Sequence, residues 1–228
     1  MVKNFTILLL MIFSLNTNAQ NVTTNHIIVI DNTGSMRGKP AKSGNLNIWT
    51  DVKNEIVKYI SSSIELGNKV TLYNFDEDLS KSKIVTINSE TQRKEAIDYV
   101  KNLNAKGLTT CLYTALYKTI NNLKEDKSER KLIYIFTDFV EACPDENYTI
   151  ENIKTTFNAV NSKDYAHLYY ISLGKPIPDK IKDFADGNDD VTATSKTPGK
   201  DKLFPEININ SSDITVDFSI NKTIEIDI

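Results

Sequence analysis

The sequence predicts an α/β fold in which a mostly parallel central sheet is covered by helices on both faces. Short runs of apolar, often β-branched residues alternate along the chain with longer segments of helical periodicity. Two of these runs, residues 27–30 and 131–137, are apolar almost throughout, as expected of strands buried on both faces. The chain of 228 residues, 40% hydrophobic and 25% charged, is long enough to form one large domain with a sizeable core.

The predicted strands end at polar loops or turns. The turn at residues 76–82 is short, so the strands on either side of it are expected to form an antiparallel hairpin. The remaining strands are separated by helices, which favours parallel pairing. The predicted strands are residues 26–30, 69–75, 83–88, 131–137, 166–173 and 191–194.

Helical periodicity accounts for the segments between the strands. In the first of them Ile48, Val52 and Ile56 recur on one face, with charged residues opposite. Gly67 and Gly187 are expected to end the first and the last helix, since glycine is common at helix C-termini. The predicted helices are residues 46–66, 91–103, 112–123, 148–161 and 178–185.

The N-terminal residues predict export. Lys3 supplies a positive charge, residues 7–13 form an apolar core, and Thr17-Asn18-Ala19 is a small-residue cleavage site, so residues 1–19 are interpreted as a signal peptide. This apolar run is too short to span a membrane. No second long apolar run follows. The mature chain is therefore expected to be periplasmic or secreted and to lack a transmembrane segment.

The C-terminal residues have a different pattern. Between residues 207 and 228, isoleucine, valine and phenylalanine mostly alternate with polar residues, which predicts two or three half-buried β-strands. The predicted organisation is a signal peptide at 1–19, an α/β domain at 20–200 and a β-strand extension at 201–228. The net charge is −3, without a large basic excess, which argues against a nucleic-acid partner.

The first predicted strand leads into a cluster of side-chain oxygens. Asp31 follows the apolar run directly, and Thr33 and Ser35 come two and four residues later. Ligands of parallel α/β sheets bind at the carboxyl ends of the strands. Three oxygens at such an end are the ligands that hard divalent cations prefer.

Two further segments reach the same edge of the predicted sheet. Asp138 closes the strand at 131–137, and Thr109 and Thr110 precede the helix at 112–123. Together with the first cluster they supply two carboxylates and several hydroxyls. Each residue also has a purely structural interpretation, because Asp and Thr are common helix caps and turn residues. The coincidence of three segments at one edge favours a cation site.

These segments resemble the von Willebrand factor A domain with its metal-ion-dependent adhesion site. Residues 31–35 (DNTGS) match the family's Asp-x-Ser/Thr-x-Ser motif, and residues 107–116 (GLTTCLYTAL) are similar to its threonine loop. Residues 136–138 (FTD) match the end of its buried strand, and residues 73–76 (YNFD) resemble the end of its second strand. The resemblance covers roughly residues 26–190 and implies a Rossmann-like fold.

The resemblance implies a site for Mg²⁺ or Mn²⁺. Thr33 and Ser35 would bind the cation through their hydroxyls, and Thr110, with Thr109 as the alternative, would bind directly or through water. Phe139 stands where the family usually has glycine, which removes no ligand atom. The implied ligands are Asp31, Thr33, Ser35, Thr110 and Asp138.

Such a site predicts a non-enzymatic binding module. Neutral hydroxyls do not neutralise a dication, and an Asp or Glu of a partner protein or surface ligand can complete the octahedral shell. One alternative is a metal-dependent hydrolase, such as a phosphatase with Asp31 as nucleophile. Thr33 disfavours it, because a second acid is expected there, and no histidine, catalytic cysteine or lysine motif surrounds the site. Another alternative is a metal-free structural scaffold.

The two cysteines of the chain are predicted to pair. Cys111 adjoins Thr110, and Cys143 lies five residues past Asp138, so both should lie at the same rim of the sheet. An oxidising compartment outside the cytosol permits a disulfide. The bond would tie the threonine loop to the loop after Asp138. The alternative is two free thiols.

Overall fold

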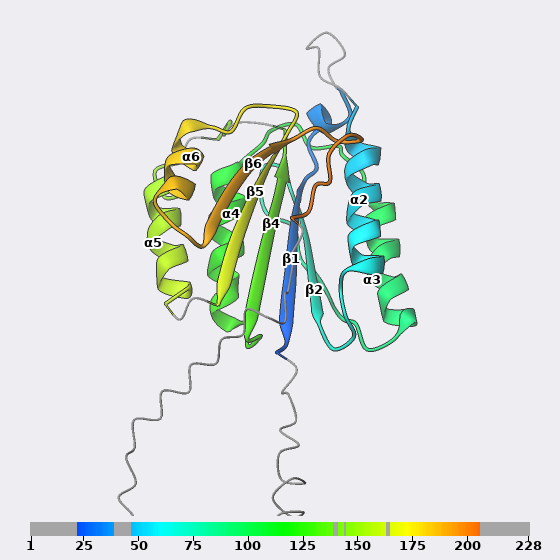
Figure 1. Ribbon diagram of the computed structural model, residues 1–228. Coiled ribbons are helices and arrows are strands. Elements are labelled where there is room, and N and C mark those ends of the chain that lie inside the picture. Colours follow the sequence, from blue (N-terminus) through cyan, green and yellow to red (C-terminus); the bar gives the residue numbers. More distant parts are fainter. Residues whose placement is uncertain (1–21, 39–46, 139–140, 144, 163–164, 206–228) are drawn as a thin grey trace, which may run out of the picture.

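The protein folds around a six-stranded sheet with strand order β3-β2-β1-β4-β5-β6 (Figure 1). The computed structural model describes residues 22–38, 47–138, 141–143, 145–162 and 165–205. All neighbouring strands in these residues pair in parallel except β2 and β3, which form the expected antiparallel hairpin. The α/β fold class is confirmed. The strands are β1 Thr24–Asp31, β2 Lys69–Phe75, β3 Lys83–Thr86, β4 Arg130–Thr137, β5 Ala166–Leu173 and β6 Val191–Lys196; the helices are α2 Trp49–Ser62, α3 Glu90–Asn102, α4 Leu112–Asn122, α5 Ile150–Val160 and α6 Asp179–Asp186, with short 3-10 turns η1 Gly34–Met36 and η3 Leu123–Glu125.

The central strand β1 is buried along its whole length. It pairs with β2 on one side and β4 on the other, and its last residue, Asp31, lies opposite Phe75 of β2. β1 begins two residues earlier than the sequence predicted, because Thr24 and Asn25 continue the ladder with β4. Parallel pairing brings the carboxyl ends of β1, β2 and β4 to one edge of the sheet, which is uppermost in Figure 1.

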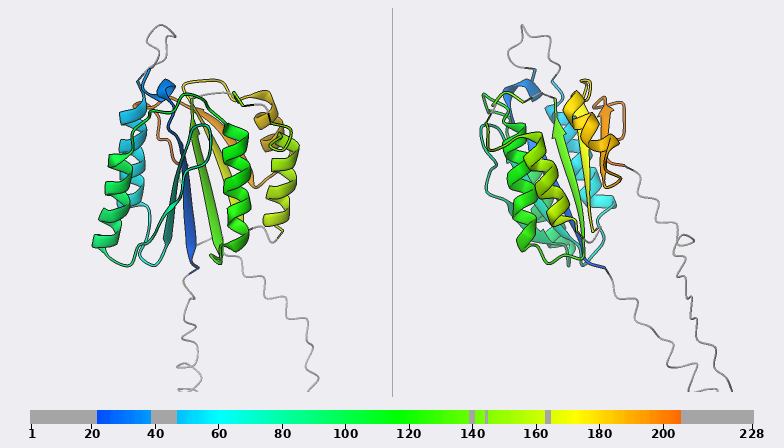
Figure 2. Two further views of the ribbon diagram at one scale, coloured as in Figure 1. Left: turned by 180° about the vertical axis from the view of Figure 1, so that it is seen from behind. Right: turned by 90° about the vertical axis from the view of Figure 1, so that its left-hand side faces the viewer.

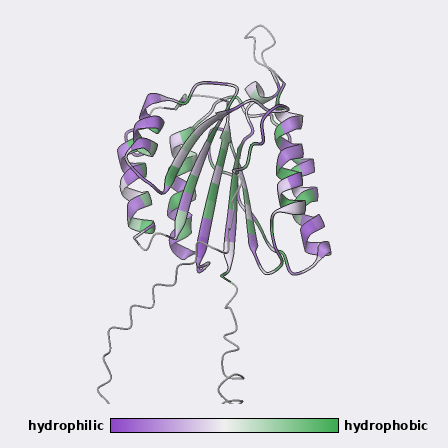
Figure 3. Ribbon diagram, in the orientation of Figure 1, coloured by the Kyte–Doolittle hydropathy of each residue, from purple (hydrophilic) through white to green (hydrophobic). Residues whose placement is uncertain are grey.

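Helices cover both faces of the sheet (Figure 2). Side chains alternate along β4, so that Tyr134 and Phe136 pack towards α2 while Ile133 and Ile135 pack towards α4 and α5. Apolar residues accordingly occupy the strands and the inner helix faces, while polar residues lie outside (Figure 3).

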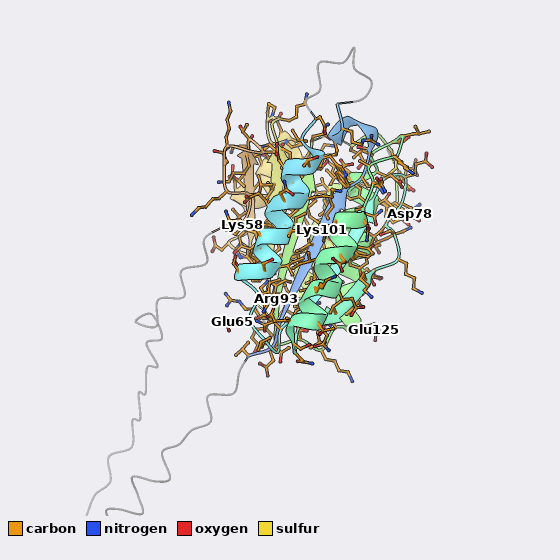
Figure 4. All side chains as sticks on the ribbon, turned by 90° about the vertical axis from the view of Figure 1, so that its right-hand side faces the viewer. Lys58, Glu65, Asp78, Arg93, Lys101 and Glu125 are labelled. Carbon is orange, nitrogen blue, oxygen red and sulfur yellow. A yellow bond between two sulfur atoms is a disulfide. The ribbon has the colours of Figure 1, made fainter. Side chains whose placement is uncertain are left out.

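The end of α2 differs from the prediction. The helix ends at Ser62 rather than at residue 66, and Gly67 is not its cap. Arg93 of α3 donates from Nη1 to the carbonyls of Ile60 and Ile64, at 2.5 and 2.8 Å, and so satisfies groups at the end of α2 (Figure 4). Gly67, with φ of +89°, belongs to the connection that leads into β2. Gly187 follows α6 as predicted.

The last described residues complete the core beside α2. Leu203 is fully buried, and the ring of Phe204 stacks on Tyr59 with 3.8 Å between centroids. The predicted signal peptide and the predicted strands at 207–228 lie outside the described residues. The division of the chain at residues 19 and 200 therefore stays a prediction. No helix in the described part is long and apolar enough to cross a membrane.

Candidate functional site

Asp31 lies at the centre of the carboxyl edge and is fully buried. Its Oδ1 accepts hydrogen bonds from the backbone N–H of Thr33 at 2.9 Å and from Thr33 Oγ1 at 2.6 Å. Its Oδ2 accepts a hydrogen bond from Thr137 Oγ1 at 2.6 Å. The carboxylate is thus fixed in one orientation. The sequence pattern alone does not indicate this role for Thr137, although it is the last residue of β4 and directly precedes Asp138.

A chain of side-chain oxygens extends from Asp31 across the edge. Thr33 Oγ1 lies 2.9 Å from Ser35 Oγ, which donates to Asp138 Oδ1, also at 2.9 Å. Thr110 Oγ1 donates to Thr33 Oγ1 at 3.4 Å. The five residues predicted as ligands therefore form one connected network of short oxygen–oxygen contacts, in which Thr33 and Ser35 each donate their single hydroxyl proton to a carboxylate. Of the two threonines weighed for the threonine loop, Thr110 is the one in this network.

Backbone contacts hold the threonine loop against the first motif. Gly34 donates its N–H to the Gly107 carbonyl at 2.9 Å, and Gly107 donates to the Asn32 carbonyl at 3.1 Å. A Cβ at position 107 would lie 2.3 Å from Cβ of Asp76, so only glycine fits there. The N–H of Cys111 donates to the Asp76 carbonyl at 2.8 Å. The loop is consequently fixed at both of its ends.

Cys111 and Cys143 form the predicted disulfide, and the alternative of two free thiols is wrong for this structure. Their Cα atoms are 5.0 Å apart, and the bond closes a loop with a sequence separation of 32. A loop of this size corresponds to roughly 3 to 4 kcal/mol of stabilisation through the unfolded chain. The N–H of Ala142 also donates to the Thr110 carbonyl at 3.0 Å. The segment after Asp138 is thereby joined to the threonine loop.

Glu141 makes a further connection that the sequence analysis missed. Its Oε2 accepts the N–H of Tyr113 in the first turn of α4 at 2.5 Å, and its Oε1 accepts the N–H of Cys143 at 2.7 Å. The carboxylate therefore caps the helix that begins just after Thr110. It also offsets the positive end of the helix dipole, which would otherwise disfavour a nearby cation. No local spacing indicates this role, because the contact spans 28 residues.

Burial dominates the electrostatics of the two aspartates. It raises the pKa of Asp31 to about 6, although the hydrogen bonds from Thr137 and Thr33 lower it, and Asp138 adds to the rise. Burial also raises the pKa of Asp138, opposed by the Ser35 hydroxyl and by the positive charge of Lys175. Two desolvated carboxylates at one edge favour the binding of an external cation, because a cation stabilises their charged forms.

The spacing of the oxygens fits a small hard cation. Mg²⁺ binds oxygens octahedrally at about 2.1 Å, which places neighbouring ligand atoms about 3.0 Å apart. Successive oxygens along the chain from Thr110 through Thr33 and Ser35 to Asp138 are 3.4, 2.9 and 2.9 Å apart. Within the described residues no group of three or more His, Cys, Asp or Glu side chains could hold a metal. A cation here would thus depend on the hydroxyls.

Comparison with known proteins agrees with this fold. The sequence model of the von Willebrand factor type A domain matches residues 26–141, which include every residue of the oxygen network. The chain belongs to this family. No curated protein matches the sequence.

Solved structures share the fold at low identity. They include the PilB minor pilin from Streptococcus sanguinis, with a TM-score of 0.52, 15% identity and coverage of 77% of this chain and 57% of the pilin. Proximal thread matrix protein 1 of the mussel byssus, with a zinc-occupied MIDAS motif, has a TM-score of 0.55, 11% identity and coverage of 77% and 44%. The SpRpn10 VWA domain has a TM-score of 0.54, 16% identity and coverage of 80% and 92%. This chain spans about half the length of the pilin and the byssus protein.

Proposed function

We propose that this protein is an exported interaction module that binds Mg²⁺ or Mn²⁺ and docks a carboxylate of a partner protein or surface ligand. The cation would be held by the two carboxylates and three hydroxyls of the network. The observation that carries the proposal is the meeting of these five side chains at one edge of the sheet, with oxygen–oxygen distances that suit hydrogen bonds and neighbouring corners of an octahedral shell alike. The proposed ligands are Asp31, Thr33, Ser35, Thr110 and Asp138.

The chemistry of the donors explains why an outside carboxylate would bind. Five protein donors fill at most five positions of an octahedral shell, so at least one position would stay open. A carboxylate of a partner can supply the missing oxygen. The site would therefore act as a docking point for an acidic residue rather than as a reaction centre.

Adhesion and export have independent support. Two of the structural neighbours are, by their names, a minor pilin and a byssal matrix protein. The disulfide between Cys111 and Cys143 is of the kind found in oxidising compartments. Both agree with the predicted signal peptide at residues 1–19.

Calorimetric titration of Mg²⁺ and Mn²⁺ into the mature protein, from residue 20 onwards, tests the proposal. We expect saturable binding to one site that is lost in Asp31→Ala and Thr110→Ala. Thr109→Ala is the matched control, because this neighbouring threonine is outside the network, and it should bind as the wild type does. Absence of binding in the wild type, even with millimolar acetate as a surrogate carboxylate, would support the metal-free scaffold instead.

The same protein can be tested as an enzyme. The proposal predicts no turnover of a generic phosphate ester in the presence of Mg²⁺. Turnover that disappears in Asp31→Asn would instead favour the hydrolase.

A further inference from the structure

A large apolar side chain stands in solvent beside the candidate cation site. Leu108 is 91% exposed, whereas the other exposed large apolar residues in the described part of the chain are between 55% and 60% exposed. Single exposed leucines are common on protein surfaces. The position of Leu108 and the rigidity of its loop distinguish it from an ordinary surface residue.

The loop that carries Leu108 is fixed on both sides. Immediately before it, Gly107 is hydrogen-bonded to Asn32 and Gly34 of the first motif. Three residues after it, Cys111 is held by the Asp76 carbonyl and by the disulfide to Cys143. Leu108 is therefore displayed on a rigid loop. Because the backbone of this loop is already held, little backbone entropy is lost when a partner covers Leu108.

Leu108 is also adjacent to the oxygen network. It lies two residues before Thr110, whose hydroxyl donates to Thr33 Oγ1, and directly after Gly107, which accepts a hydrogen bond from Gly34. The rim also carries charges of both signs. Lys106 and Lys175 are exposed, and so are Glu77 and Asp78, which follow β2 at the same edge, while Asp76 lies against Gly107. A partner would meet Leu108 and these charges around the cation.

We infer that Leu108 and the cation site form one docking surface. The fitting partner is a protein segment in which a large apolar residue neighbours the Asp or Glu that reaches the cation. The carboxylate completes the metal shell, and the apolar neighbour covers Leu108 and removes it from water. Covering an exposed apolar side chain removes its surface from water, which favours binding. This inference rests on the proposed function and adds to it the kind of partner that is recognised.

Selection from a library of random seven-residue peptides displayed on phage tests the inference. The full mature chain serves as bait. Phage are bound in the presence of Mg²⁺ and are then eluted with EDTA, which removes the cation. The variants are Leu108→Ser and, as a matched control, Leu66→Ser. Leu66 is 60% exposed and lies in the connection between α2 and β2, at the opposite edge of the sheet. A magnesium titration of each variant checks that the cation site is intact.

The wild type and Leu66→Ser are expected to select peptides with an Asp or Glu beside a large apolar residue. Leu108→Ser is expected to bind Mg²⁺ normally, to keep the preference for an acid and to lose the apolar preference, with at least a tenfold lower recovery of wild-type peptides. Acidic peptides without an apolar preference in the wild type, or an unchanged preference in Leu108→Ser, would overturn the inference alone. If no acidic peptide elutes with EDTA, the proposed function fails, and the inference fails with it.

Discussion

Two aspartates at opposite edges of the same sheet have opposite surroundings. At the amino edge, Asp126 accepts hydrogen bonds from Lys69 Nζ at 2.6 Å, Asn25 Nδ2 at 2.5 Å and Ser128 N at 3.0 Å. Burial alone would raise its pKa, but these partners lower it to about 2. At the carboxyl edge, burial raises the pKa of Asp31 to about 6, and its hydrogen bonds come from neutral groups.

The difference separates a structural acid from the acid that we propose as a cation ligand. Asp126 has a cation of the same chain, Lys69, as its partner, and its charge stabilises the fold. Asp31 is buried among hydroxyls and beside a second carboxylate, so its charge is best satisfied by an ion from outside. The two surroundings therefore predict different responses to mutation of the same residue type.

The largest expected effect is on cation affinity. Asp31→Asn keeps the size of the side chain but removes its charge, and we expect at least a hundredfold weaker Mg²⁺ binding, equivalent to about 2.7 kcal/mol. Asp126→Asn should bind Mg²⁺ as the wild type does. Titration calorimetry of both variants measures this. An equal loss of Mg²⁺ affinity in Asp31→Asn and Asp126→Asn would show that the two edges of the sheet do not differ in cation binding.

The next effect is on stability without metal. Asp126→Ala removes a carboxylate that accepts several hydrogen bonds, and Lys69 loses its ion-pair partner. We therefore expect a loss of about 2 kcal/mol in the free energy of unfolding. Asp31→Asn should lose less, because it also removes the cost of burying a charge. Urea unfolding in EDTA provides both values. A larger loss for Asp31→Asn would contradict the contrast.

Acid titration sharpens the contrast. Because the pKa of Asp126 is lowered from 3.8 to about 2, its ionised form contributes stability above about pH 4, and this contribution disappears as the pH falls towards 2. The stability difference between the wild type and Asp126→Asn should therefore shrink over this interval. Asp31 has the opposite effect on stability, because its pKa is raised in the folded state from 3.8 to about 6. The free energy of unfolding that Asp31 contributes should therefore fall as the pH rises from about 4 to 6. Urea midpoints measured at each pH provide the test.

The smallest effect concerns Glu141. Glu141→Gln keeps one acceptor, for the N–H of Tyr113, but loses the acceptor for the N–H of Cys143 and removes the negative charge at the start of α4. We expect a loss of about 1 kcal/mol in stability and a few-fold weaker Mg²⁺ binding, through the helix dipole. Glu151→Gln in the first turn of α5 is the control, because it changes the same charge at another helix. If Glu141→Gln binds Mg²⁺ as tightly as the wild type does, Glu141 caps α4 and has no effect on the cation site.

The sequence was sufficient to predict the part of the site that is local. Asp31, Thr33 and Ser35 lie within five residues of a strand end, so their spacing alone brings the oxygens together. The parallel sheet followed from the alternation of strands and helices. The disulfide followed from the expected position of both cysteines at the same rim of the sheet. Thr137 and Glu141 could not be predicted in the same way. Their roles depend on contacts 106 and 28 residues apart in the sequence.

The end of α2 shows the same limit in the fold. Gly67 was a reasonable helix terminus by residue type, but the helix ends at Ser62. The guanidinium of Arg93, from the next helix, satisfies carbonyls that a local cap would otherwise bind. Local spacing therefore predicted the elements and the first motif, whereas long-range side-chain contacts determined the helix boundary and the supports of the site.

The most direct test of the cation site is anomalous X-ray diffraction from crystals of the mature protein grown with Mn²⁺. The account predicts one strong anomalous peak at the carboxyl edge of the sheet, about 2 to 2.5 Å from Thr33 Oγ1 and Ser35 Oγ. The peak should be absent from crystals of Asp31→Asn and present in crystals of Asp126→Asn. A peak elsewhere, or none at this edge in the wild type, would contradict the central claim that these oxygens form a cation site.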